Sequence, residues 1–398
     1  MVYWVWLADV LGFASNKLKP LVQYFGSAER IFNADIKQIN NAVSLNSAEI
    51  KRFRNKSITK AQKIISDCKA SNIGIVCYND SQYPDILRNI INPPACLYFK
   101  GSFPDFDNLP VISIVGTRNA DEYSYKAAWS LSARLSLANC LIVSGGAVGI
   151  DSAAHKGALD VGADTVAVLA CGINYNYLKK NEELRKRISE NGCLISECPP
   201  DHPIRKTSFH IRNRLISGLS LGTVIVEAGE KSGALITART AAEQGRDVFV
   251  ITGKPDDKKY AGTNALLRDG AIPIFKFEDV LSEYYSSFGN IIDVEKSVKF
   301  NLSTLYNSLY NVNFSKQREE YIEKNAGNAA YNEKNLKNQN LTLSKNAEIV
   351  YNYLDKDFFT VDDLSEVNLN VTEIFTAVTE LELLGLVKAV PGGRYTKI

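Results

Sequence analysis

Short apolar runs alternate with helical stretches through the middle of the chain, from Val111–Val115 to Val248–Ile251. The segments between these runs have apolar residues at the spacing of helices that bury one face. Parallel strands need such crossovers, and strands covered on both faces are apolar throughout. We therefore predict an α/β fold with a doubly wound parallel sheet. The predicted strands are Val111–Val115, Cys140–Val143, Thr165–Leu169, Cys193–Ile195, Thr223–Val226 and Val248–Ile251.

The first part of the chain has the spacing of short helices. Apolar residues such as Ile36 and Ile39 recur about one helical turn apart, and Gly12 and Gly26 stand where the chain would turn between helices. The pattern predicts a helical domain over residues 1–72, of the SAM or helix-hairpin-helix kind. Such domains can hold a DNA backbone or serve protein contacts, and the sequence leaves both open.

A segment rich in turn signals follows. Between Ile73 and Gly101, the pairs Tyr83-Pro84 and Pro93-Pro94 restrict the direction of the backbone, so we expect a connector. It leads into the alternating strands and helices. Residues 73–285 are therefore predicted to form one extended Rossmann-like domain.

The remainder divides into a polar segment and a small domain. Residues 286–340 are rich in Asn, Lys and Glu with few apolar groups to bury, which predicts a flexible linker. Residues 341–398 have three helical stretches and then a two-stranded hairpin, the order of a winged helix. Its third helix carries glutamates that would repel phosphate, so we expect it to contact protein. The segments are Asn346–Leu354, a helix after Thr360, Val371–Leu384 with Glu373, Glu380 and Glu382, Leu386–Val390 and Arg394–Lys397.

Composition narrows the class of protein but names no partner. The chain has 398 residues, 45% hydrophobic and 23% charged, as in ordinary globular proteins, and its net charge is only +2. A nucleic-acid partner would therefore need a local basic surface. No apolar run reaches the length of a membrane span, so we expect a cytoplasmic protein without membrane contact. The seven cysteines lie in or beside apolar runs, which is typical of core residues, and we predict no metal site.

Two glycine-containing turns follow the first two predicted strands. The first contains Gly116, Thr117 and Arg118, which offer close backbone approach, a hydroxyl and a bidentate phosphate donor. The second has Ser144, Gly145, Gly146 and Gly149 before a helix, and a doubly wound sheet would place it beside the first. Two adjacent turns of this kind predict a phosphate site.

The same residues have a purely structural interpretation. The glycines can simply make tight turns, and for Asp151 and His155 we favour a role in starting and packing the next helix. The spacing Gly145-x-x-x-Gly149 is not the dinucleotide fingerprint, and no acidic residue ends the strand Thr165–Leu169 to hold a ribose. We therefore expect no nicotinamide cofactor, and no other cofactor is predicted.

Two later segments add cations near the same edge of the sheet. Phosphate would attract Lys206, Arg212 and Arg214, and the ring of Phe209 could stack on a base, although Phe209 could equally lie in the core. The strand Thr223–Val226 also leads into a glycine turn and a helix. The candidate contacts from these segments are Lys206, Phe209, Arg212, Asn213, Arg214, Lys231, Ser232 and Gly233.

Together these segments resemble the DNA-processing protein A family, also called DprA or Smf. The resemblance implies a single-stranded DNA-binding protein that protects incoming DNA and loads the RecA recombinase in natural transformation, with a homodimer formed through the Rossmann-like domain. It also implies DNA contacts at Arg118, the Gly145–Gly149 turn, Lys206, Phe209, Arg212 and Lys231. The matching segments include Leu97–Gly101, Val115–Arg118, Ser144–Asp151, Ser196-Glu197, Arg212–Arg214, Glu227, Ser232–Ala238 and Gly262–Ala271.

The sequence departs from the family pattern at four positions. Val148 stands where an arginine is usual, which removes one phosphate contact, and Leu178 and His210 stand where prolines are usual. Thr252 precedes Gly253 where the family has proline. These departures concern the groove and the RecA contact more than the fold.

Two rival functions use the same crevice. A nucleotide hydrolase would place Glu227 near a ribose, but the glycine-rich pattern of such hydrolases is missing, and Glu227 could instead bond the loop backbone. A nucleotide-sensing module would bind a free mononucleotide tightly, whereas a strand-binding protein gains affinity from several phosphates. We expect a DNA-binding protein and not an enzyme.

Overall fold

A computed structural model describes residues 1–177, 179–205, 207–311, 344–353, 387–390 and 394–397, with a few positions between 364 and 381. The described residues form two compact units, Met1–Leu305 and Tyr306–Ile398. Within these residues, no helix combines the length and the apolar character that a membrane crossing requires. All seven cysteines are buried, as expected of core residues.

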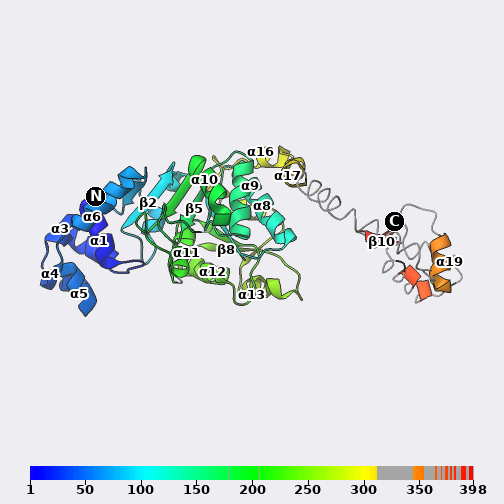
Figure 1. Cartoon of the computed structure of the whole chain (residues 1–398), viewed down its shortest axis with the longest axis horizontal. Helices are drawn as coiled ribbons and strands as arrows, with labels where there is room; N and C mark the ends of the chain where they lie inside the picture. The colour runs from blue at the N-terminus through cyan, green and yellow to red at the C-terminus, as the bar shows by residue number, and fades with distance from the viewer. Residues whose placement is uncertain are drawn as a thin grey trace, which may run out of the picture. The chain divides into compact units, whose positions relative to one another are not determined.

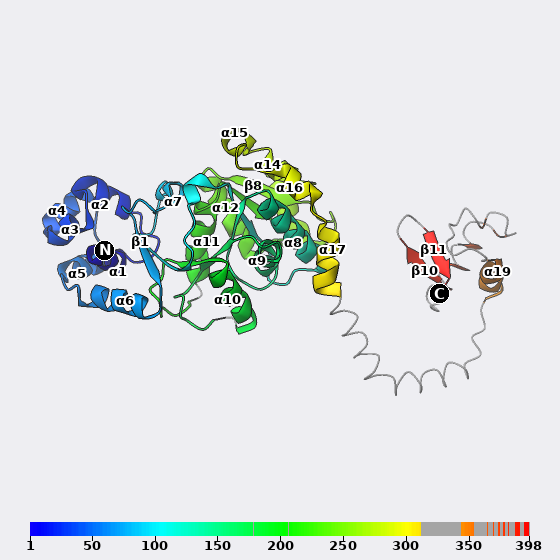
Figure 2. The same cartoon turned by 90° about the horizontal axis from the view of Figure 1, so that it is seen from above.

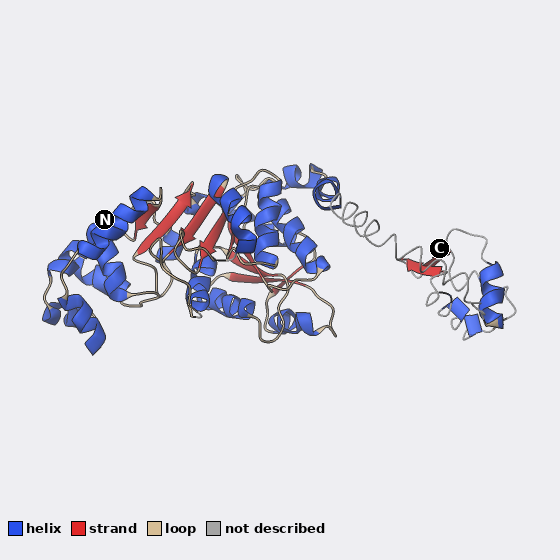
Figure 3. Cartoon of the chain, in the orientation of Figure 1, coloured by secondary structure: helices blue, strands red, loops and turns tan. Residues whose placement is uncertain are grey.

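The centre of the first unit is a nine-stranded sheet in the order β1-β2-β6-β5-β4-β3-β7-β8-β9 (Figure 3). Adjacent strands from β6 to β9 along this order are parallel. The predicted parallel α/β sheet is therefore confirmed. These strands are β3 Val111–Val115, β4 Leu141–Ser144, β5 Thr165–Leu169, β6 Gly192–Ser196, β7 Gly222–Ile225, β8 Asp247–Ile251 and β9 Ile272–Ile274.

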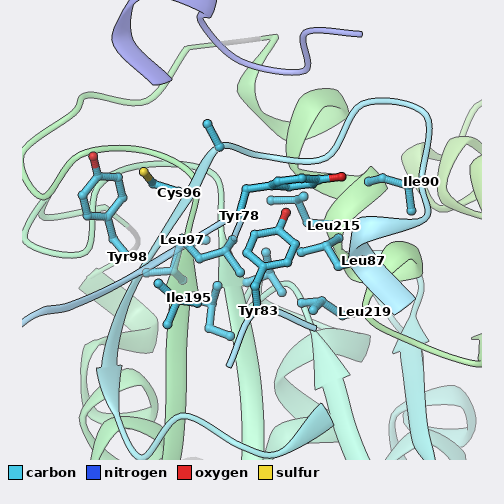
Figure 4. Close-up of a cluster of buried hydrophobic side chains, with 14 of the residues drawn as sticks. Tyr78, Tyr83, Leu87, Ile90, Cys96, Leu97, Tyr98, Ile195, Leu215 and Leu219 are labelled. Atoms are coloured by element: carbon cyan, nitrogen blue, oxygen red, sulfur yellow. The ribbon is translucent and has the colours of Figure 1, made fainter. Parts of the chain in front are cut away.

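The segment expected as a connector instead extends the sheet. It forms β1 (Gly74–Cys77) and β2 (Cys96–Gly101), which pair antiparallel, and β2 pairs antiparallel with β6. The turn signals lie in the chain between these strands, where helix α7 (Asp85–Arg88) forms. There the Tyr83 hydroxyl donates to the Pro94 carbonyl at 2.8 Å, and Tyr83 packs in the buried cluster drawn in Figure 4. The prolines of the segment between β1 and β2 predicted turns, so the two short strands on either side of it were not predicted.

Helices cover both faces of the sheet (Figures 1 and 2). Helices α8 and α9 pack closely, because a side chain at Gly157 would lie 2.3 Å from the Trp129 carbonyl oxygen. The indole of Trp129 also donates to the Asp160 carboxylate at 2.9 Å. One face carries α8 Glu122–Leu137, α9 Ile150–Asp160 and α10 Glu182–Glu190, and the other carries α11 Ser208–Gly218, α12 Gly233–Glu243 and α13 Ala261–Arg268.

The N-terminal residues form helices, as their spacing predicts. Side-chain capping boxes at Asp35 and Asn46 begin two of them, and the Trp6 indole donates to the Asn55 carbonyl at 3.2 Å. Their buried residues join the core of the sheet in one cluster. The SAM or helix-hairpin-helix identity stays a prediction. The helices are α1 Val2–Leu11, α2 Leu18–Phe25, α3 Ala28–Asn33, α4 Ile36–Ala42, α5 Ser47–Arg54 and α6 Thr59–Ala70.

The first part of the predicted linker is helical in the structure. Helix α16 (Val294–Lys299) packs on α8, where Ser297 is fully buried and its hydroxyl donates to the Arg134 carbonyl at 2.8 Å. The chain therefore leaves the first unit later than residue 286. Residues 312–343 lie outside the described part. The neighbouring helices are α14 Glu278–Leu281, α15 Tyr285–Phe288 and α17 Leu302–Tyr306.

The second unit contains three of the predicted elements. Helix α19 spans Lys345–Tyr353, and β10 (Val387–Val390) pairs antiparallel with β11 (Arg394–Lys397). The other two predicted helices fall mostly outside the described residues. The winged helix as a whole stays a prediction.

Candidate nucleic-acid interface

The candidate site lies at the carboxyl ends of the central strands, where β3 and β7 are neighbours. The chain crosses from β3 toward β4 on one side and from β7 toward β8 on the other, so their loops diverge and leave a crevice. A cavity of about 380 Å³ occupies this position. We call it the edge groove. Its lining includes Gly116, Thr117, Arg118, Ala147, Asp151, Phe209, His210, Arg212, Asn213, Ser232, Gly233, Ala234 and Thr237.

The turn after β3 is held by the turns after β4 and β7. The Thr117 amide donates to the Glu227 carbonyl at 2.9 Å, and the Ile150 amide donates to the Thr117 carbonyl at 3.2 Å. A side chain at Gly116 would lie 2.6 Å from Ile150, so glycine is needed for this approach. The Arg118 side chain is left exposed beyond the turn.

The turn after β4 packs against the turn after β3. Gly149 has φ of 82°, and a Cβ there would lie 2.4 Å from the Thr117 carbonyl oxygen. Ser144 is fully buried, with its hydroxyl donating to the Ile114 carbonyl at 2.6 Å. Gly145 and Gly146 are also buried, and neither they nor Ser144 lines the edge groove. Their predicted DNA contacts stay predictions.

Arg212 is a buried cation in the lining of the edge groove. Its guanidinium donates to the carbonyls of Gly145 and Val168, and only 6% of the residue is exposed. Burial lowers the pKa of Arg212, and the nearby Asp151 carboxylate opposes this effect. Burial also raises the pKa of Asp151 despite Arg212. The arginine thus joins two loops near an interior carboxylate, and its predicted phosphate contact remains untested.

The opening of the groove carries a cation on an aromatic ring. The Arg118 guanidinium carbon lies 4.6 Å from the centre of the Phe209 ring, and the Tyr177 ring centre lies 5.9 Å from the same ring. Phe209 is half-buried, so part of its surface reaches solvent. The sequence did not single out Tyr177 as a site residue. Its position next to Leu178, which like Lys206 lies outside the described residues, was the available signal.

The remaining predicted contacts separate in space. Arg214 is 5% exposed and does not line the edge groove, because its guanidinium bonds the Glu197 carboxylate and donates to the Asn92 carbonyl at 2.6 Å. Ser232 lines the groove and caps α12, with its hydroxyl accepting from the Ala234 amide at 3.3 Å. Gly233 also lines it, and Lys231 is exposed next to it.

Three helix N-termini meet at the groove. The first turns of α9, α11 and α12 contribute Asp151, His210 and Ala234 to its lining. The positive end of the helix dipole favours anions at each of these ends. Some first-turn amides already have partners, such as that of Ile150 with the Thr117 carbonyl and that of Ala234 with the Ser232 hydroxyl. These features and the exposed Arg118 are the groove's candidate phosphate contacts.

A lysine-rich loop at the same edge was not predicted as part of the site. It follows β8, and Lys254, Lys258 and Lys259 are exposed there. The Lys258 carbonyl oxygen would lie 3.2 Å from a Cβ at Gly229, so this loop rests on the loop after β7. Three lysines directly after the predicted strand Val248–Ile251 were the signal that could have found it.

His155 has the structural role that the sequence favoured. It is fully buried, and its Nδ1 lies 2.9 Å from the Thr165 hydroxyl oxygen, which itself donates to the Ile142 carbonyl at 2.8 Å. The hydroxyl can therefore only accept, so Nδ1 carries the proton. Burial, and then the charge of Arg212, lower the pKa of His155 to about 3.

Comparisons with known proteins agree with this arrangement. Residues 74–285 match the family described as DNA recombination-mediator protein A. The DNA processing protein DprA of Bacillus subtilis is 34% identical over 239 residues, covering 60% of this chain and 80% of that protein. Protein Smf of Escherichia coli is 31% identical over 313 residues, covering 78% and 74%. The X-ray structure of DprA from Streptococcus pneumoniae superposes with a TM-score of 0.62 at 29% identity, covering 71% of this chain and 98% of that one. This chain therefore belongs to the DprA/Smf family of DNA-processing proteins.

Proposed function

We propose that the edge groove binds single-stranded DNA without sequence preference. The observation that carries this proposal is the Arg118 guanidinium on the Phe209 ring, at the opening of a groove where three helix N-termini meet. The cation and the backbone amides can bind phosphate, and the exposed surface of the Phe209 ring can stack on a base. Every base has a face that can stack, so this pairing does not select a sequence.

A single strand fits this opening better than a duplex. The aromatic ring lies beside the groove. It can stack only on a base whose face is open, and in a duplex the adjacent bases cover both faces. The basic loop after β8 extends the same edge beyond Lys231, so several phosphates can be bound in succession. A free mononucleotide would use only part of this surface.

Anisotropy of labelled poly-dT, measured against a duplex of equal length at two salt concentrations, tests the proposal. We expect preference for the single strand, weaker binding in Arg118→Ala and in Lys231→Ala, and a steep loss of affinity with salt. Arg268→Ala is the matched control, because this side chain is also exposed. It lies at the end of α13, just before the start of the parallel strand β9, and therefore at the edge of the sheet opposite the groove. Equal weak binding in all variants, with tight binding of dTMP, would instead support a nucleotide sensor.

The position of Glu227 supports a binding protein over a hydrolase. Glu227 is 2% exposed, and its carboxylate accepts a hydrogen bond from the Asp121 amide at 3.2 Å, in the manner of a loop-holding residue. It is not part of the groove lining. Release of free base from nucleotides incubated with the protein would contradict this part of the proposal.

We extend the proposal to what family membership implies. The protein would protect incoming DNA, help load RecA in transformation or recombination, and act as a homodimer through the Rossmann-like domain. The first two parts are tested by RecA-dependent ATP hydrolysis on single strands covered by a competing binding protein, which this protein should accelerate. Sedimentation equilibrium tests the dimer, and a monomer at all concentrations would exclude it.

A further inference from the structure

A second cavity lies between the N-terminal helices and the antiparallel side of the sheet, within the unit Met1–Leu305. Its volume is about 510 Å³, in the range of small-molecule sites. Helices α1 and α6, strand β2 and the loop after β6 line it. The cavity shares no lining residue with the edge groove. We call it the helix–sheet cavity.

The floor of this cavity presents a hydroxyl group that lacks a partner. Alternate residues of a strand face opposite sides, so Cys96 and Tyr98 line the cavity while Leu97 faces the core (Figure 4). Tyr98 is 1% exposed, and in the part of the chain that the structure describes its hydroxyl makes no hydrogen bond. Burial raises the pKa of Tyr98, so the phenol is neutral and can donate. The hydroxyl oxygen is not fully enclosed, so a ligand in the cavity can pair with it.

The rim of the cavity is acidic. Four carboxylates and two lysines line it. Asp9 pairs with Lys60 at 2.6 Å, and Glu197 pairs with Arg214. Among the described residues, Asp67 and Asp201 have no ion-pair partner.

The electrostatic effect of these carboxylates is visible at a neighbouring thiol. Burial, and then the charges of Asp67 and Asp201, raise the pKa of Cys68 to about 11. Negative charge on this side of the cavity attracts cations. On the side of His202, burial and then the charges of Arg205 and Lys60 lower the pKa of that residue, so the acidic part of the cavity is the part near Asp67.

Apolar and aromatic surface lies between the floor and the rim. Val5 and Ile64 form part of the wall, and Phe13 is 37% exposed at the opening, with its ring edge-on to His202 at 5.0 Å between ring centres. An exposed phenylalanine beside carboxylates suits an organic cation, because the ring face attracts positive charge.

We propose that the helix–sheet cavity binds a small aromatic amine that carries a polar group at the end opposite its ammonium. The polar group bonds the Tyr98 hydroxyl, the ring packs on the apolar wall, and the ammonium lies at Asp67 and Asp201. This ligand class follows from the three parts of the cavity: the Tyr98 hydroxyl at the floor, the apolar wall and the acidic rim. It depends on no property of the edge groove.

Calorimetry with the full chain and three probes tests the contribution of each part of the cavity to binding. Tyramine has all three features, phenethylamine lacks the hydroxyl, and 3-(4-hydroxyphenyl)propionate has the opposite charge. We expect tyramine to bind about tenfold more tightly than phenethylamine, the equivalent of one hydrogen bond, and the propionate to bind most weakly. Tyr98→Phe should abolish the difference between the two amines, and the pair Asp67→Asn with Asp201→Asn should abolish the difference between tyramine and the propionate.

Controls separate this proposal from the DNA-binding one. Asp269→Asn removes an exposed carboxylate outside the cavity and should leave tyramine binding unchanged, as should Arg118→Ala. Tyr98→Phe retains the ring, and its thermal unfolding shows whether the fold is intact. Failure of tyramine to bind, binding that is indifferent to probe charge, or binding that survives either set of substitutions would overturn the proposal.

Discussion

The buried His155 makes a definite prediction about stability and pH. Its Nδ1–H is committed to the Thr165 hydroxyl, and its Nε2 is buried without a hydrogen-bond partner among the described residues. A second proton on this ring would place a charge in the interior with Arg212 nearby. The folded protein should therefore resist protonation of His155.

The magnitude follows from the two pKa values. The pKa of His155 is about 3 in the folded state, against about 6.5 for an unfolded chain. The unfolded state therefore takes up the proton first, so the stabilisation is complete above pH 6.5 and is lost as the pH falls toward 3. Each pH unit in this window lowers the free energy of unfolding by about 1.4 kcal/mol, so the loss at pH 5.5 relative to pH 8 is about 1.4 kcal/mol.

Urea unfolding at pH 8, 6.5 and 5.5 measures this loss. His155→Gln should be less stable at pH 8 but should lose about 1.4 kcal/mol less than the wild type on going to pH 5.5. His210→Gln changes an exposed histidine and is the control. The pKa of His202 is also lowered, first by burial, so the comparison of variants isolates His155. Parallel pH profiles for wild type and His155→Gln, or a histidine NMR titration showing all three rings protonated by pH 5.5, would refute the argument.

Three further outcomes are expected. Lys254→Gln with Lys258→Gln should reduce the slope of log affinity for poly-dT against log salt by about 1.4, since each single-strand phosphate contact contributes about 0.7, whereas Arg268→Gln should leave it unchanged; an unaltered slope places the loop outside the DNA path. Gly149→Ala should lower the free energy of unfolding by about 1 to 3 kcal/mol more than Gly162→Ala, because both glycines have positive φ but only Gly149 faces a backbone oxygen; equal losses in urea unfolding contradict the clash. Arg214→Met should cost about 3 kcal/mol by leaving Glu197 unpaired, and adding Glu197→Gln should recover part of this loss; no recovery in the double variant argues against the pair.

The repeating pattern of the central domain was sufficient to predict six of the seven strands in the parallel part of its sheet, and the three-residue strand β9 was not predicted. Strands β3 and β5 have the predicted bounds, and the strands with shifted ends differ by one residue or so, because uniformly apolar runs between helices leave few alternatives. Strands β1 and β2 were missed for a physical reason. Their partners are each other and β6, which are distant in sequence, and the prolines that suggested a connector belong to the excursion between them. Pairing of this kind leaves no local periodic signal.

The sequence located the glycine turns, but it did not show which of their residues line the edge groove and which are buried. Adjacent glycine turns on neighbouring strands do meet in the structure, since β3 and β4 pair in parallel. Which residues of a turn face the groove and which face the core depends on neighbouring loops. Ser144 and Gly145, for example, are covered by Ile114 and Arg212, which come from other elements of the sequence.

The basic run Lys206–Arg214 shows why a cluster of cations in sequence is not a cluster on a surface. Most of it folds into the first turns of α11, and a helix distributes successive side chains around its axis. Phe209, His210, Arg212 and Asn213 line the edge groove, while Arg214 bonds Glu197. Arg212 is buried there and donates to interior carbonyls. Arg212 and Arg214 therefore both bond other loops, and their predicted DNA contacts stay predictions. In the proposed binding mode, phosphate contacts come from Arg118, from the neighbouring lysines and from the helix N-termini. The neutral substitution of a single surface cation should therefore weaken DNA binding without abolishing it.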